Sequence, residues 1–228
     1  MVAKTWAALG AVTASLALAS VAHADVESFN PDAFDLSTAI DRDVAPVDHA
    51  LELAVGGHYT EGGGDTGGAQ SARIGDLSGA GGGVQLELSA RVSPHWAVGA
   101  YGSGAYFSAG TMDSGQHVYG ASAGLQVVAH ARPEHSVDPW ASVGAGWRGM
   151  WLTGDQSTSL QGLELARVQL GIDYRISKNF AIAPVIGASA AMFLGENSPM
   201  TDSLVGIGDR TVHFYGWTGV QGRFDVGN

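Results

Sequence analysis

The sequence predicts an all-β fold, an eight-stranded antiparallel up-and-down transmembrane β-barrel. Three observations predict it. From residue 49 onward, apolar and polar side chains alternate with a period of two, the period of a β-strand. Eight segments of roughly ten residues show this alternation, and about ten residues cross a bilayer as a tilted strand. The connections between the segments alternate between short and long, as in a meander threaded through a membrane.

The composition excludes several classes of protein. Of the 228 residues, 11 are Lys or Arg and 22 are Asp or Glu, which gives a formal net charge of -11. This sign argues against nucleic-acid binding, which needs a basic surface to neutralise phosphates. Cysteine is absent, so disulfides, thiolate metal sites and cysteine nucleophiles are excluded. After the first two dozen residues, no apolar run is long enough to cross a bilayer as a helix.

The first part of the chain, 1–24, is predicted to be a secretory signal peptide. Lys4 supplies the charged start, and an uncharged stretch of apolar and small residues follows at 6–21. Small residues then precede a cleavage site between Ala24 and Asp25. The alternative is a membrane anchor that the protein retains.

The remainder divides into an acidic N-terminal segment, 25–48, and the predicted β-barrel, 49–228. The acidic segment is expected either to lie free as a leader or to pack on the barrel as a short helix. Within the barrel we expect strands at 51–59, 84–92, 96–107, 117–130, 140–152, 163–176, 180–194 and 212–226.

Three of these strands carry informative details. The segment 84–92 alternates most cleanly, with apolar side chains on one face and polar ones on the other. In the sixth strand, Leu163 and Leu165 fall on the opposite parity from the later apolar residues, which predicts a bulge near Ala166 or a loop there. Pro184 lies inside the seventh strand, and because a closed barrel has no free edge, we expect a local bulge there too.

The connections fall into two groups. Short ones are expected at 93–95, 131–138 and 177–179. Long ones are expected at 60–83, 108–116, 154–162 and 195–210. A barrel in an outer membrane has short turns on its periplasmic side and long loops outside.

The alternation by itself fits a soluble sandwich as well as a membrane barrel, and the two differ in which face meets water. A water-exposed face normally carries many charged residues, whereas the polar faces of the third to fifth strands are small. These small residues are Ala97, Gly99, Ser103, Gly120, Ser122, Gly124, Ser142, Gly144 and Gly146. Aromatic residues also stand at strand ends, as in the interfacial girdles of membrane barrels. They are Tyr59, Trp96, Tyr106, Trp140, Trp151, Tyr174 and Phe180.

The signal segment, the eight alternating strands, the rhythm of turns and loops and the aromatic final strand ending near Phe224 resemble small outer-membrane β-barrel proteins of the OmpA-like and opacity-protein-like kind. The resemblance covers about 51–226 and is one of pattern. It implies a monomer in the bacterial outer membrane, in contact with outer-membrane lipid including lipopolysaccharide. It also implies recognition by the outer-membrane assembly machinery, which reads a last strand ending in an aromatic residue. Phe224 is the nearest match, although four residues follow it.

An eight-stranded barrel encloses a lumen that side chains largely fill. By parity, the predicted lumen charges are Glu52, Glu87, Arg91, Arg148, Asp173, Arg175 and Arg223. Because the first strand neighbours both the second and the last, Glu52 can reach Arg91 or Arg223. The simpler interpretation is a structural network of ion pairs, since an unpaired charge in this space is costly. The alternative is a gate, in which rearranged pairs open a thin ion path.

Three functions remain open. The first is a structural or surface-interaction role, with a partner bound by the acidic loops that carry Glu61, Asp65, Asp76, Glu196, Asp202 and Asp209. The second is a narrow channel for ions or small solutes. The third is a lipid-modifying enzyme.

No enzyme, cofactor or metal site is predicted. A lipid hydrolase needs a serine activated by a histidine, and the sequence 134–136, which holds such residues, lies in an expected periplasmic turn. His58 and His213 share lumen parity near the outer ends of the first and last strands, where barrel closure suggests that they are neighbours. No third ligand is clearly placed beside them.

Overall fold

A computed structural model describes residues 50–67, 72–111, 117–154, 157–197 and 203–227. The predicted signal peptide, the cleavage site between Ala24 and Asp25, and the acidic segment 25–48 lie outside these residues, as does Asp202.

All eight expected strands are present, several of them longer than expected. The long strands are β1 (Leu51–Gly63), β2 (Ser78–Ser93), β3 (Trp96–Ala109), β4 (His117–His130), β5 (Val137–Thr153), β6 (Thr158–Ser177), β7 (Phe180–Asn197) and β9 (Val212–Val226). Two short elements lie in the long connections, the helix α3 (Ile74–Leu77) and the strand β8 (Val205–Gly206). Among the described residues, no helix has the length and apolarity needed to cross a membrane.

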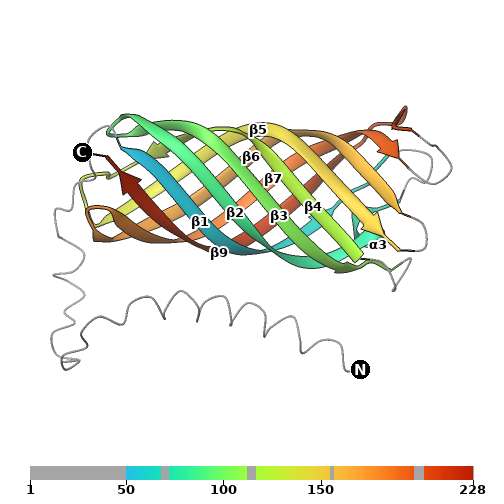
Figure 1. Ribbon diagram of the computed structural model, residues 1–228, viewed down its shortest axis with the longest axis horizontal. Helices are drawn as coiled ribbons and strands as arrows, with labels where there is room; N and C mark the ends of the chain where they lie inside the picture. Colours follow the sequence, from blue (N-terminus) through green and yellow to red (C-terminus); the bar gives the residue numbers. More distant parts are fainter. Residues whose placement is uncertain (1–49, 68–71, 112–116, 155–156, 198–202, 228) are drawn as a thin grey trace, which may run out of the picture. The chain divides into compact units, whose positions relative to one another are not determined.

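The long strands close into one antiparallel barrel, as Figure 1 shows. Each of β1 to β7 pairs with the next in sequence, and β7 pairs with β9. The ring closes where β1 pairs with β9, from Leu51 opposite Val226 to Gly63 opposite Phe214. The predicted up-and-down topology is therefore confirmed.

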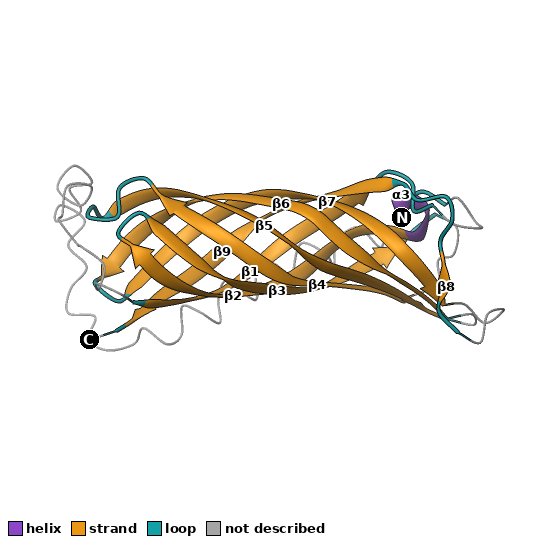
Figure 2. Cartoon of the chain, turned by 90° about the horizontal axis from the view of Figure 1, so that it is seen from above, coloured by secondary structure: helices purple, strands orange, loops and turns teal. Residues whose placement is uncertain are grey.

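The two ends of the barrel differ in their connections. The start of β1 and the end of β9 lie at one end of the barrel. The short turns at 94–95, 131–136 and 178–179 lie at the same end. The other connections, 64–77, 110–116, 154–157 and 198–211, lie at the opposite end, where Figures 1 and 2 show α3 and Figure 2 shows β8. We call these the terminal end and the loop end. The long connection predicted at 154–162 is wrong, because β6 begins at Thr158 and leaves only 154–157.

Apolar side chains face outward and charged ones face the lumen, as the sequence predicts. Leu86, Leu88 and Leu170 are each 52% exposed. By contrast, Glu87, which lies between Leu86 and Leu88, is only 3% exposed. Asp173, on the same strand as Leu170, is 0% exposed. A soluble sandwich would show the reverse, because water would face the polar side chains. The soluble alternative is therefore excluded.

The bulge predicted near Ala166 is confirmed. On β6, Glu164 pairs with Gly146 and Arg167 pairs with Gly144, so two residues of β6 oppose one residue of β5. Leu165 and Ala166 both face outward. The extra residue therefore lets Glu164 and Arg167 both point into the lumen.

The bulge predicted at Pro184 is wrong. Pro184 pairs with Val220 of β9, and the described register with β6 is the same on both sides of it. Around Pro184, the β6–β7 ladder lacks pairs between Gly171–Val185 and Tyr174–Ile182. Since proline lacks the N–H of a ladder bond, the barrel accommodates it by omitting pairing locally, without an inserted residue.

Candidate functional site

The lumen is filled by three layers of side chains, which we name by position. The terminal layer comprises Glu52, Arg91, His130, Asp138, Asp173, Arg175, Arg223 and Asp225. The central layer comprises Gln85, Glu87, Tyr101, Arg148, Glu164, Arg167, Gln169 and Trp217. The apolar plug, towards the loop end, comprises Ile74, Phe107, Val118, Met150, Leu152, Leu160, Phe193, Ile207 and Tyr215.

Glu52 is the centre of the terminal layer. Its carboxylate is 3% exposed and forms an ion pair with Arg91 of β2. On the other side, Nη1 of Arg223 lies 3.3 Å from Glu52 Oε2. Both arginines that the sequence places within its reach therefore contact it. A carboxylate flanked by two guanidiniums is compensated for the loss of water.

The aspartates of the terminal layer are held in the same way. Nε of Arg223 lies 3.5 Å from Asp173 Oδ2, and the indole of Trp140 donates to Asp173 Oδ1 at 2.8 Å. Arg175 pairs with Asp225 at the C-terminal end of β9. These contacts tie β5, β6 and β9 together across the lumen.

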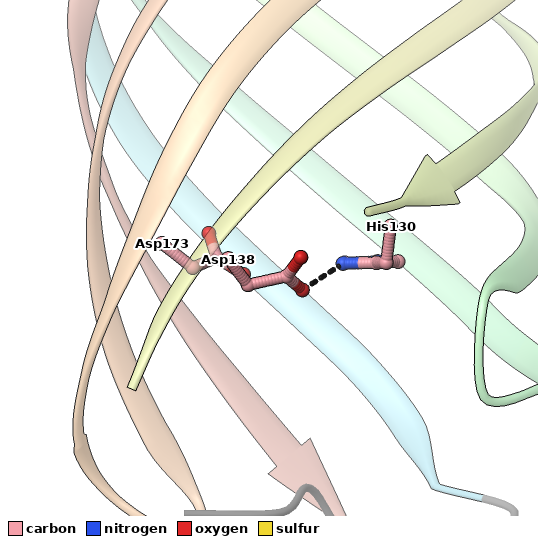
Figure 3. A group of neighbouring side chains, drawn as sticks. All are labelled: His130, Asp138 and Asp173. Carbon is pink, nitrogen blue, oxygen red and sulfur yellow. Dashed lines mark hydrogen bonds and ion pairs between the residues drawn. The ribbon is translucent and has the colours of Figure 1, made fainter. Parts of the chain in front are cut away.

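His130, Asp138 and Asp173 form a compact group, drawn in Figure 3. One donor atom from each lies within 4.8 Å of the others, and histidine with two carboxylates is a donor set that metal ions accept. However, His130 Nδ1 is 2.7 Å from Asp138 Oδ2, and Arg223 Nη1 is 3.1 Å from His130 Nε2. Because a guanidinium beside the group repels a cation, we interpret the three residues as part of the ion-pair layer.

The central layer combines ion pairs with stacked rings. Arg148 Nη1 lies 2.8 Å from Glu164 Oε1, and the hydroxyl of Tyr101 donates to Glu164 Oε2 at 2.6 Å. Arg167 lies between two rings, 4.6 Å from the centroid of Tyr101 and 4.2 Å from that of Trp217. Such stacking favours a guanidinium that has lost its water.

The seven charges predicted for the lumen all face it, but they belong to two layers. Five lie in the terminal layer, and Glu87 and Arg148 lie in the central one. The prediction missed His130, Asp138, Glu164, Arg167 and Asp225. Asp225 shares the parity of Arg223 and was detectable from the sequence. Arg167 likewise shares the parity of Asp173 and Arg175. Glu164 was not detectable from parity, because the bulge separates it from them.

The apolar plug closes the lumen towards the loop end. Ile74 of α3 is fully buried in it, and Leu77 packs against it. Ile207, from the connection after β7, joins from the other side. Arg148 links plug and central layer, because its guanidinium lies 3.4 Å from the ring centroid of Tyr215. The loops thus contribute to the core and do not merely cover it.

The connections at the loop end are bonded to one another, and we call this assembly the loop cap. The hydroxyl of Thr211 donates to the carbonyl of Asp65 at 2.7 Å, which joins the first connection to the last. The hydroxyl of Thr111 lies 3.0 Å from the carboxylate of Asp76. The amide of Gly110 donates to the carbonyl of Leu77 at 3.2 Å. Three connections are therefore held in one arrangement.

His58 and His213 are not the neighbours that barrel closure suggests. His58 pairs with Gly219 of β9, six positions along the strand from His213. At about 3.3 Å per residue, the two are separated by about 20 Å along the strand. His213 instead stacks on Phe193, with ring centroids 4.3 Å apart. The idea of a shared metal site at these two residues is therefore wrong.

The closed sheet, the apolar outer face and the charged lumen together define an integral membrane β-barrel. Each of the eight long strands has two neighbours in the ring, so the closed sheet has no open edge towards lipid. This is the polarity of a protein whose solvent is the bilayer.

Comparison with known proteins agrees with this class. No family model matches the chain, and no curated protein matches it. The crystal structure of the outer membrane protein OprG from Pseudomonas aeruginosa superposes with a TM-score of 0.54 at 9% identity, over 82% of this chain and 100% of that one. Neisserial surface protein A gives a TM-score of 0.47 at 10% identity, over 76% of this chain and 96% of that one. The OprG match shows that the chain has the fold of small bacterial outer-membrane barrels, which confirms the predicted resemblance.

Proposed function

We propose that this protein is a structural barrel of the bacterial outer membrane that presents a pre-formed loop cap to partners outside the cell. The filled lumen is the observation that carries the proposal. Side chains occupy the lumen from the terminal layer to the apolar plug, and a cavity between the central layer and the plug has a volume of about 20 Å³. That volume suits about one water molecule, so it supports an anchoring role over conduction.

The ordering of the loop cap supports binding as its task. Hydrogen bonds between connections lower the conformational entropy that a partner has to remove on binding. Asp65, Asp76 and Asp209 give the cap acidic groups, which favour a partner with a basic surface. Lipopolysaccharide and other outer-membrane lipids are the expected neighbours of the barrel wall.

Planar-bilayer conductance separates this function from the narrow channel. We expect the wild-type barrel to leave the bilayer conductance at the level of the lipid alone, because the plug and two charged layers obstruct the lumen. Regular conductance steps that disappear in Arg148→Ala would contradict the proposal and favour the channel.

Binding through the cap is tested with liposomes that carry the refolded barrel. We expect them to adhere to a polylysine surface more than to a polyglutamate surface. A triple variant should lose most of this difference in adhesion. It combines Asp65→Asn, Asp76→Asn and Asp209→Asn. Glu134→Gln is the matched control, because Glu134 is exposed in a turn at the terminal end. Equal adhesion of the triple variant and the wild type would argue against the acidic cap as the binding surface.

A further inference from the structure

A small cavity lies inside the barrel between the central layer and the apolar plug. Its volume is about 20 Å³. It is lined by His58, Thr60, Gln85, Ser103, Ala105, Phe107, Gly120, Ala121, Arg148, Arg167 and Trp217. None of these lining residues is a carboxylate, whereas two are guanidiniums and one is an imidazole. The cavity is therefore lined by positive charge and hydrogen-bond donors.

Arg167 has no direct ion pair in the described part of the lumen. It is 3% exposed, and among the described residues no carboxylate oxygen lies within 4.0 Å of its guanidinium. Its Nη2 instead donates to the side-chain oxygens of Gln85 and Gln169, the latter at 3.1 Å. Its Nε has no hydrogen-bond partner among the described residues. Glu164 and Glu87 attract its charge from a longer distance. Its Nε, however, is a buried donor without an acceptor, which is costly.

The other hydrogen-bond donors around the cavity differ in whether they already have an acceptor. Arg148 already donates to Glu164 and to the hydroxyl of Ser189, at 2.8 and 3.1 Å. His58, by contrast, has a buried Nδ1 without a partner in the described part of the chain. Two residues that each have an unpartnered nitrogen, His58 on β1 and Arg167 on β6, therefore line one cavity.

We propose that this cavity is a binding site for a single small monatomic anion, chloride in the cell. Arg167 supplies the charge that holds it, Arg148 supplies a second cation, and the imidazole of His58 supplies a further donor. The volume of about 20 Å³ suits a ligand the size of about one water molecule, which favours a monatomic ion over phosphate, sulfate or carboxylates. The central layer lies on one side of the cavity and the apolar plug on the other.

Bromide tests occupancy directly, because it substitutes for chloride and scatters X-rays anomalously. In crystals of the wild-type protein grown in sodium bromide, we expect an anomalous peak within hydrogen-bond distance of Arg167. Crystals in which only a water occupies the cavity would overturn the proposal.

Refolding tests whether the ion matters for the protein. Wild-type protein is refolded in detergent in sodium chloride or sodium gluconate at equal ionic strength, since gluconate is too large for the cavity. We expect the urea midpoint of unfolding to rise with chloride concentration and then to saturate. Arg167→Gln should lose this dependence, whereas Arg73→Gln should keep it, because the side chain of Arg73 is 74% exposed.

The two measurements are read together. A bromide peak without any chloride dependence of the midpoint would indicate an adventitious ion only and would overturn the proposal. If Arg167→Gln does not fold, the chloride dependence of the wild type and the bromide peak still decide the matter. Neither measurement depends on what the loop cap binds.

Discussion

Single residues in the lumen each hold several partners, and Arg223 shows this best. It is 2% exposed, contacts Glu52, Asp173 and His130, and lies 4.5 Å from the ring centroid of Trp140. Removing it leaves two carboxylates without a neighbouring charge from β9. In a low-dielectric space this loss exceeds what the pair itself contributes, because the remaining charges stay buried.

The variant Arg223→Gln is expected to lower the free energy of unfolding by about 3–5 kcal/mol, the usual cost of breaking a buried ion pair. Urea titration of the refolded protein, followed by heat-modifiable gel migration, measures this change. Lys178→Gln is the control, since Lys178 is exposed in a turn and its removal changes the net charge equally. A loss no larger than that of the control would show that the terminal layer contributes little to stability.

The register of each strand decides which of its side chains face the lumen, and the bulge in β6 is the clearest case. Alternation assigns side chains to lumen or lipid only while no residue is inserted. One extra residue places both Glu164 and Arg167 inside, where Glu164 meets Arg148 at 2.8 Å. Without it, one end of β6 would turn its polar side chains towards lipid.

Deletion of Ala166 is therefore expected to abolish most of the heat-modifiable folded form after refolding, because Glu164 and Arg167 then cannot both face the lumen. Ala166→Val is the control, since it keeps the residue count at an outward-facing position. A deletion variant that refolds as well as the wild type would mean that the bulge has no role in placing the central layer.

The whole molecule is a closed sheet with apolar side chains on its outer face and charged side chains in its lumen, the reverse of a water-soluble protein. Outward leucines, valines and isoleucines cover the strands, as the 52% exposure of Leu86 and of Leu170 illustrates. Such a surface is stable only where lipid replaces water around it.

Leu86→Arg is accordingly expected to cost about 2–4 kcal/mol in a bilayer, the cost of arginine on the lipid face near the midplane. The measurement is unfolding by denaturant in phospholipid vesicles. Leu204→Arg, at a position that is 56% exposed in the loop cap, should cost much less. If both substitutions cost the same, the outer face around β2 is not embedded in lipid.

The strands were predictable because their pattern is local and repeats along the chain. Even so, β2 begins at Ser78, ahead of the alternating residues from Val84 onward. The glycines at 81–83 carry no alternation, and what makes them a strand is pairing with β1 and β3. Pro184 was misjudged for a related reason, since only the neighbouring ladder reveals that pairing is omitted there.

The amino-acid sequence by itself determined the number of strands, their direction and which face meets lipid, because each strand carries its own two-residue period. Only the tertiary structure decided which charges meet. The sequence left open whether Glu52 meets Arg91 or Arg223, and the closed barrel brings both to it. The filling of the lumen by α3 and the cavity beside Arg167 also depend on closure, since each is bordered by several strands and no single strand encodes it.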